Sequence, residues 1–138
     1  MDSTIWGPHY WFVLHTIAFN YPIHPTSITK KIHHRLIYNL HEFMPNRTIA
    51  TTFEKILKKY PVTPYLDTRA DFIKWMHFIH NKINERIDKP IISLSDHYDE
   101  FKQHYETKQT KLQRIWNEKR KILFTLIIFT LVALVYMK

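Results

Sequence analysis

The fold of this chain is decided by an aromatic stretch near its N-terminus, WGPHYWFVLH over residues 6–15, which continues through Ala18 to Tyr21-Pro22. Within it, Trp11, His15 and Ala18 stand at positions i, i+4 and i+7, so a helix places them on one face. Tyr21 ends that helix, because the residue before a proline avoids the helical region. The stretch therefore predicts a helix that presents an indole and an imidazole on the same side.

A second stretch carries a matching set of side chains. Trp75, His80 and Asn84 lie in a helical pattern that ends before Lys89-Pro90, and His80 and Asn84 share a face at i and i+4. Two such helices in a bundle can hold a flat heteroaromatic ligand between them, and Lys89 at the helix end can meet a phosphate. An aromatic core with hydrogen-bonded core histidines is the alternative interpretation.

The composition limits the possible functions. A length of 138 residues allows one small domain, with a net charge of +8, a single glycine and no cysteine. Without a thiol, the chain forms no disulfide, no thiolate metal site and no cysteine nucleophile of its own. A single glycine argues against a glycine-rich phosphate loop. The high apolar fraction, 45% of the residues, predicts a folded chain.

Apolar residues recur at helical spacing along nearly the whole chain, which predicts an all-α body. Helices are expected from Pro8, over 27–44, over 47–59, and behind Thr68 and Asp71, which resemble a capping box. Ser95 is expected to cap a further helix that starts at Asp96. The apolar side chains expected in the core of the second, third and fourth helices are Ile32, Leu36, Ile37, Leu40, Phe43, Ile49, Phe53, Ile56, Leu57, Phe72, Trp75, Met76, Ile79, Ile83 and Ile87.

The C-terminal segment predicts a membrane anchor. Residues 122–137, ILFTLIIFTLVALVYM, carry no charge and span about 24 Å as a helix, which flanking basic side chains extend toward a bilayer core of about 30 Å. A buried core helix is the alternative interpretation. Residues 106–121 form a basic juxtamembrane linker or helix, which places residues 1–105 on the cytosolic side. The first residues do not resemble a signal peptide.

Metal, nucleic-acid and triad chemistry are not expected. His77 and His80 share one side of a helix, but no further ligand stands at a recognisable zinc spacing. The basic residues are scattered rather than interleaved with aromatics on one face, so we expect no nucleic-acid partner. No serine or threonine has the sequence context of a catalytic nucleophile.

The two aromatic stretches together resemble a known family. The pattern WGPxxWxxLHxxAxxYP, followed by HNxxN after a tryptophan and then by KP, covers residues 6–90 and is similar to the FAD-linked sulfhydryl oxidases of the Erv/ALR family. That resemblance implies a four-helix bundle with a short extra helix, FAD bound at the mouth of the bundle, and a homodimer. It implies an Erv/ALR-like FAD-binding domain over residues 1–105.

The resemblance also assigns the residues that would contact FAD. The chain departs from the family where Pro8 replaces an arginine of many relatives, and where His77 replaces a cysteine of some. The positions matching the flavin-binding motif are Gly7, Trp11, His15 and Tyr21 from the first helix and Trp75, His80, Asn84 and Lys89 from the fourth.

A third departure removes the chemistry of the family. The resemblance implies a Cys-x-x-Cys motif at the start of the third helix, beside the flavin. In this sequence Asn46 and Ile49 occupy the positions of the two cysteines. Neither side chain can exchange with a thiol or form a flavin adduct. Asn46 is instead a good helix N-cap and Ile49 a good core residue.

Three functions follow as hypotheses. The first is a membrane-anchored, FAD-binding pseudoenzyme with a structural or interaction role. The second is a subunit that supports thiol oxidation in a heterodimer with a Cys-bearing relative, through the face of the first two helices. The third is a membrane-tethered bundle without flavin. The abundance of Ile, Lys, Asn, Tyr and Phe suggests AT-rich coding. Compact family members with the WGPxxW variant resemble those of large DNA viruses, so a viral or virion membrane is the expected location.

Overall fold

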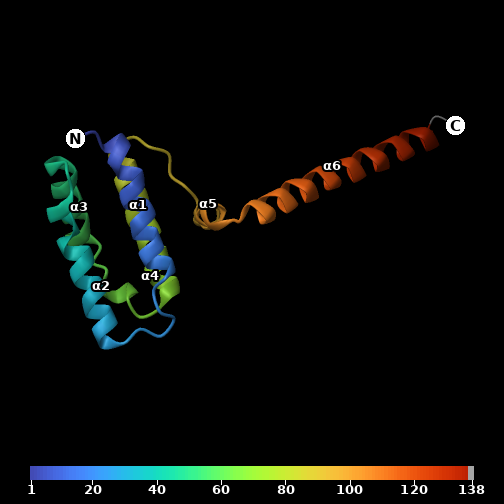
Figure 1. Cartoon of the computed structure of the whole chain (residues 1–138). Helices are drawn as coiled ribbons and strands as arrows, with labels where there is room; N and C mark the ends of the chain where they lie inside the picture. Colours follow the sequence, from blue (N-terminus) through green and yellow to red (C-terminus); the bar gives the residue numbers. More distant parts are fainter. Residues whose placement is uncertain (137–138) are drawn as a thin grey trace. The chain divides into compact units, whose positions relative to one another are not determined.

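The computed structural model describes residues 1–136, apart from the side chains at positions 131, 134 and 135. Every regular element in this part of the chain is helical (Figure 1), which confirms the all-α prediction. In chain order the elements are α1 (Ser3–Phe19), α2 (Ser27–Asn39), the 3-10 turn η1 (Leu40–Phe43), α3 (Arg47–Lys59), the 3-10 turn η2 (Thr63–Tyr65), α4 (Arg69–Arg86), α5 (Leu94–Tyr105) and α6 (Lys108–Tyr136).

The chain divides into two compact units. The N-terminal unit covers Met1–Tyr98 and the C-terminal unit begins at Asp99. In the N-terminal unit α1 and α4 lie side by side, and α3 also contacts α4 (Figure 1). These helices enclose an apolar core that includes Leu14, Phe53 and Ile79. The domain limits at residues 105 and 121 stay predictions.

Helix α1 begins earlier than the sequence pattern predicts. The Asp2 carboxylate accepts a hydrogen bond of 2.8 Å from the Thr4 N–H, so the helix starts at Ser3 rather than at Pro8. A side chain that satisfies a free N–H of the first turn fixes the start of a helix. Pro8 therefore lies inside α1, where its ring removes one backbone hydrogen bond.

Helix α2 starts as predicted but ends early. Thr26 caps it, and its last residues form the tighter turn η1 rather than a continuous helix to Met44. Ile37 and Leu40 are buried. Three of the five predicted core residues, however, are exposed, namely Ile32, Leu36 and Phe43. The prediction was wrong for Ile32 and Leu36 because they lie on an apolar face of α2 that does not pack on the bundle, and for Phe43 because the predicted helix gives way to η1 before it.

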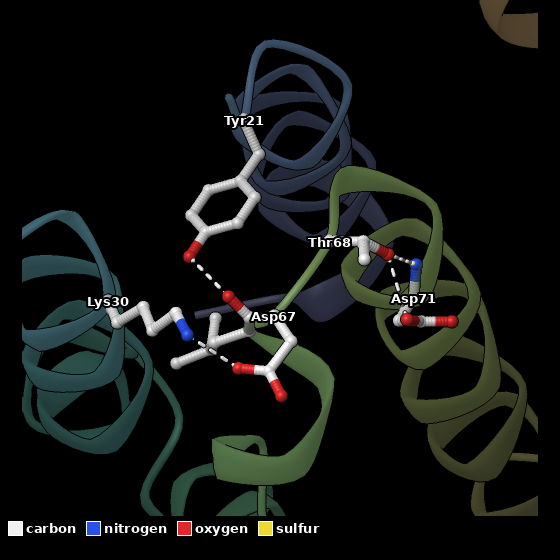
Figure 2. Close-up of polar contacts among 6 residues, drawn as sticks. Tyr21, Lys30, Asp67, Thr68 and Asp71 are labelled. Carbon is white, nitrogen blue, oxygen red and sulfur yellow. Dashed lines mark hydrogen bonds and ion pairs between the residues drawn. The ribbon is translucent and has the colours of Figure 1, made fainter. Parts of the chain in front are cut away.

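Helix α3 has the predicted bounds, and the segment before α4 is held by polar contacts that Figure 2 shows. The Tyr21 hydroxyl donates to the Leu66 carbonyl oxygen at 2.8 Å, and the Lys30 ammonium pairs with the Asp67 carboxylate at 2.6 Å. The Thr68 hydroxyl caps α4 by accepting from the Asp71 N–H, as predicted. Together these bonds tie the ends of α1, α2 and α4 to one loop.

The predicted stripe on α4 is buried except at its end. Phe72, Trp75 and Ile83 belong to the core, whereas Ile87, beyond the last turn of the helix, is 39% exposed. The residue after it, Asp88, has a φ of 53°, a left-handed conformation that ends helices. The prediction that Ile87 is a core residue was therefore wrong.

Helix α5 is capped by Ser93 instead of by the predicted Ser95. The Ser93 hydroxyl accepts from the Asp96 N–H at 3.1 Å and donates to the Asp96 carboxylate at 2.7 Å. These reciprocal bonds move the start of the helix to Leu94.

Helix α6 joins the predicted linker and the predicted anchor into one element of 29 residues. Within residues 1–136, no helix is both long enough and apolar enough to cross a membrane. The structure therefore does not support the predicted transmembrane helix over 122–137, since α6 carries the basic residues of 108–121 in its first half. The end of the predicted anchor, Met137, lies outside the described residues.

Candidate ligand site between the helices

A cavity of about 300 Å³ lies in the N-terminal unit, between α1, α3, α4 and the segment after α4. Cavities of this size hold small molecules, and mostly apolar walls with a few polar groups are typical of such sites. We call it the aromatic cavity. It is lined by Ser3, Trp6, Gly7, Pro8, Tyr10, Trp11, Leu14, Met44, Ile49, Phe53, His80, Ile83, Asn84, Ile87, Lys89, Pro90 and Ile92.

Two stacked rings from different helices form one wall of the aromatic cavity. The Trp11 indole of α1 and the His80 imidazole of α4 have centroids 4.0 Å apart and planes that differ by 13°. Stacked faces of this kind offer a flat surface to a planar ligand. The sequence predicts that Trp11 and His80 contact a flat ligand held between the two helices, and in the structure their rings stack directly on each other.

The polar groups of the aromatic cavity gather where α4 ends. The Asn84 carbonyl oxygen accepts the backbone N–H of Lys89 at 2.9 Å, and the Asn84 side-chain amide donates to the Pro90 carbonyl oxygen at 3.3 Å. These bonds fold the chain back on α4, so the exposed Lys89 lies at the rim. An ammonium there can meet an anionic part of a ligand.

Two features of α1 leave the aromatic cavity open to a ligand. A Cβ atom added to Gly7 would meet nothing within 4 Å, so the space beside this helix turn is not filled by the protein. The indole N–H of Trp6 is buried and has no hydrogen-bond partner. A buried donor without a partner costs about 1–3 kcal/mol, and a polar ligand atom in the cavity would satisfy it.

His15 does not line the aromatic cavity but contacts His80, which does. It is buried, and its Nε2 lies 3.0 Å from the Nδ1 of His80. Its ring centroid lies 3.9 Å from that of His97 on α5, and the His97 ring lies 5.4 Å from that of His77. We call these four side chains the histidine cluster. Among the described residues no group of three or more metal-ligating side chains is placed to hold a metal ion.

Burial lowers the pKa of three members of the histidine cluster, His15, His80 and His97, so these three rings are neutral at pH 7. It lowers the pKa of His15 to about 2, with a further contribution from the neighbouring His97, His80 and His77. It also lowers the pKa of His80 to about 4, helped by His97, His77 and Lys89, and that of His97 to about 4, helped by His77. The contact between His15 and His80 is therefore one between neutral rings, in which one nitrogen donates and the other accepts.

Tyr21 and Trp75 do not reach the aromatic cavity. Both are buried in the core, and their polar atoms are bonded to backbone carbonyls, the Tyr21 hydroxyl to Leu66 and the Trp75 indole N–H to Tyr60 at 3.2 Å. Of the other six positions that match the flavin-binding motif, His15 contacts His80 without lining the aromatic cavity. The five that line it are Gly7, Trp11, His80, Asn84 and Lys89.

Replacing Tyr21 by Phe is expected to lower the free energy of unfolding by about 1–3 kcal/mol, because the Leu66 carbonyl loses its buried partner. Ligand binding in the aromatic cavity should not change, because Tyr21 is absent from its walls. Chemical denaturation measures the first quantity, and Tyr65→Phe is the matched control since Tyr65 is exposed. A variant of unchanged stability with weakened ligand binding would show the opposite role.

The two positions of the missing cysteines differ in surroundings. The Asn46 side chain caps α3 by accepting the Ile49 N–H at 3.1 Å, as predicted. Ile49 is half-buried and lines the aromatic cavity. A hydrocarbon side chain therefore stands on the cavity wall where the resemblance expects sulfur, and the chain has no cysteine anywhere.

Several residues of the site were not predicted from the sequence to be part of it. Trp6 and Tyr10 were part of the quoted aromatic stretch but were not assigned to the ligand, and their rings pack edge to face at 5.0 Å. Their spacing of four residues was the available signal. Phe53 and Ile83 were predicted only as core residues. Nothing in the local pattern of α5 indicated that His97 would join the histidine cluster.

An all-helical domain with an aromatic-walled cavity between its helices defines a ligand-binding helical bundle. The family model described as "Erv1 / Alr family" matches residues 8–113. The chain therefore belongs to the Erv1 / Alr family, which confirms the resemblance noted in its sequence.

Relatives and solved structures agree with this assignment. The mitochondrial FAD-linked sulfhydryl oxidase erv1 of Schizosaccharomyces pombe is 31% identical over 87 residues, which are 63% of this chain and 48% of that protein. An FAD-linked sulfhydryl oxidase of African swine fever virus (isolate Warthog/Namibia/Wart80/1980) is 33% identical over 98 residues, 71% of this chain and 81% of the viral protein. The chain spans about half the length of the cellular relatives it matches.

The crystal structure of the FAD binding domain of Erv1 from Saccharomyces cerevisiae superimposes with a TM-score of 0.69 at 26% identity. The match covers 77% of this chain and 99% of that domain. The yeast Erv1 core gives a TM-score of 0.63 at 28% identity, over 67% of this chain and 77% of the core. The helical bundle of this chain is thus the fold of the family.

Proposed function

We propose that the aromatic cavity binds FAD and that the chain alone does not oxidise thiols. The observation that carries this proposal is the aromatic cavity itself, which retains its flat stacked wall while Ile49 occupies the expected position of a cysteine. A bound flavin supplies a two-electron acceptor. The residues of this chain then bind and orient that group without a sulfur atom to deliver electrons to it.

The groups around the aromatic cavity fit such a ligand. Trp11 and His80 offer a planar surface, the space beside Gly7 is open, and the Trp6 N–H lacks a partner. Asn84 and Lys89 supply polar contacts at one end. His15 would act through His80, whose ring it holds by the 3.0 Å contact.

The function that remains is a structural or interaction role, and we propose that it is exercised in a virus particle. Sulfhydryl-oxidase relatives occur in African swine fever virus and in invertebrate iridescent virus 6, which supports this location. If purified virus particles from its source do not contain the chain, this location is contradicted.

A second candidate function is that of a subunit paired with a Cys-bearing relative. It is favoured by exposed apolar side chains on the first two helices, Ile5 and Val13 on α1 and Ile28 and Ile32 on α2, each between 55% and 69% exposed. Exposed apolar side chains that gather into one patch are typical of interaction sites. We propose that this face pairs with a second copy or with a relative. Sedimentation of the wild-type chain and of Ile28→Glu/Ile32→Glu, each alone and mixed with a Cys-bearing relative, tests the pairing. A wild type that stays monomeric in both samples would contradict it.

We also propose that residues 122–137 attach the chain to a membrane, with the N-terminal unit on the cytosolic side. The support is the exposure of the described apolar side chains in this segment, among them Phe124, Ile128 and Phe129, and the basic residues before it. Flotation with lipid vesicles tests the attachment. Equal flotation of the wild type and of Phe124→Lys/Ile128→Lys would contradict it.

Replacing Trp11 by Ala is expected to weaken FAD binding at least about tenfold, because the planar wall of the aromatic cavity is lost and aromatic stacking contributes about 1–3 kcal/mol per ring. Fluorescence titration of the flavin-free chain with FAD measures this affinity. Trp116→Ala is the matched control, since Trp116 is exposed and lies outside the cavity. Equal affinity for FAD in wild type and Trp11→Ala would favour a bundle that does not use this cavity for flavin.

A further inference from the structure

A second cavity, of about 410 Å³, lies between α3 and α4 and shares no lining residue with the aromatic cavity. We call it the basic cavity. Its charged walls comprise Lys55 and Lys59 of α3 and Lys82, Glu85 and Arg86 of α4, and Tyr60 adds an aromatic side chain. Four cationic groups and one carboxylate therefore face the same space.

Only one of these four cations has an acidic partner. The Lys82 ammonium donates to both oxygens of Glu85, at 3.0 and 2.8 Å, which uses the single carboxylate of the cavity. Among the described residues, no carboxylate lies within salt-bridge distance of Lys55, Lys59 or Arg86. The basic cavity thus carries three cations without an acidic partner, of which Lys59 places its ammonium over the Tyr60 ring, 5.3 Å from the ring centroid.

A lysine of α3 outside the basic cavity does have an acidic partner. Lys58 stands between the two cavity lysines in sequence, and its ammonium pairs with Glu54 at 2.6 Å. Lys55 and Lys59 are one helical turn apart, so their side chains approach each other on the cavity side. Like charges that converge around a concavity repel one another and create a positive potential that attracts an anion.

We propose that the basic cavity binds a phosphate-bearing anion, a phosphate or pyrophosphate group. Three cations match an anion of two or more charges, and the planar guanidinium of Arg86 donates two parallel hydrogen bonds to the oxygens of a phosphate. The cavity volume falls within the range of small-molecule sites. The proposal does not depend on flavin binding, because the two cavities have separate walls.

Isothermal titration calorimetry of the full chain with pyrophosphate tests the proposal. We expect saturable binding that weakens with added salt, and a loss of affinity of at least about tenfold in Lys55→Gln/Arg86→Gln, because two charge-assisted hydrogen bonds to the anion are lost. The matched control is Lys58→Gln/Lys74→Gln, which removes the same charge from the same two helices outside the basic cavity. The control should bind as the wild type does.

Two further measurements separate this cavity from other sources of binding. Lys89→Gln removes the cation at the rim of the aromatic cavity and should leave the affinity for pyrophosphate unchanged. Vesicles that contain a phosphoinositide should compete with pyrophosphate if the group belongs to a lipid headgroup, and should not compete if the ligand is a free phosphate compound. Absence of binding would overturn the proposal, as would equal losses in the two double variants or a loss confined to Lys89→Gln.

Discussion

The double substitution Asn46→Cys/Ile49→Cys is expected to give the FAD-loaded protein a dithiol oxidase activity, with a rate at least about a hundredfold above the wild-type background. Two cysteines held side by side next to the cofactor react far faster than free thiols in solution, since fixed proximity and orientation accelerate reactions by much more than a hundredfold. Residue 49 lies on the wall of the aromatic cavity and residue 46 begins the same helix. A dithiol would be oxidised as the disulfide between residues 46 and 49 is reduced. That disulfide would then re-form as its two electrons and two protons pass on to oxygen and give hydrogen peroxide, with bound flavin supplying the two-electron acceptor between them.

Oxygen consumption with dithiothreitol measures this gain. The single variants Asn46→Cys and Ile49→Cys are the controls, because neither can form the disulfide within one chain, and both should stay at background. Removing the Asn46 cap costs about 1 kcal/mol, so circular dichroism must show that the double variant is folded. A folded, flavin-loaded double variant without activity would show that more than the cysteines has been lost.

Lowering the pH from 7 to 5 is expected to destabilise the N-terminal unit by several kcal/mol. In the unfolded chain His15, His80 and His97 titrate near the ordinary pKa of 6.5, whereas in the folded chain their pKa values are about 2, about 4 and about 4. Between these values the unfolded state binds protons that the folded state does not. The stabilisation is therefore complete above pH 6.5 and is lost as the pH falls, through about 4 for His80 and His97 and through about 2 for His15.

At pH 5 each imidazole kept neutral costs about 2 kcal/mol, which is large beside a typical unfolding free energy of about 5–15 kcal/mol. Denaturant unfolding across this pH range should show a slope that approaches three protons. His97→Gln should reduce that slope by about one proton. A slope in His97→Gln equal to that of the wild type would contradict the neutral state of His97.

Parts of the fold could be predicted because their signals are local. Helix α3 has the predicted bounds, since Asn46 caps its start and Tyr60-Pro61 ends it. The same holds for the Thr68 cap of α4. Helical spacing predicts that α1 and α4 each present a ring to the interior, Trp11 and His80, but it does not predict that the two rings stack on each other. Caps and helical spacing depend on residues a few positions apart, which a sequence displays directly.

The errors arose where distant segments decide the outcome. Ile32 looked like a core residue because helical spacing cannot tell which apolar face of α2 meets the bundle. Tyr21 and Trp75 matched the flavin motif, yet their polar atoms bond to carbonyls of residues 66 and 60. His97 joins the histidine cluster because the first turn of α5, which belongs to the N-terminal unit, lies against His15. None of these contacts leaves a trace in the local pattern.

The flavin content of the purified full-length chain tests the central claim most directly. We predict a visible absorbance spectrum of bound, oxidised flavin, near one FAD per chain after incubation with excess FAD and removal of the unbound cofactor, together with no oxygen consumption on addition of dithiothreitol. A colourless protein after that incubation would contradict flavin binding in the aromatic cavity. Turnover of the dithiol by the cysteine-free chain would contradict its assignment as an inactive member of the Erv1 / Alr family.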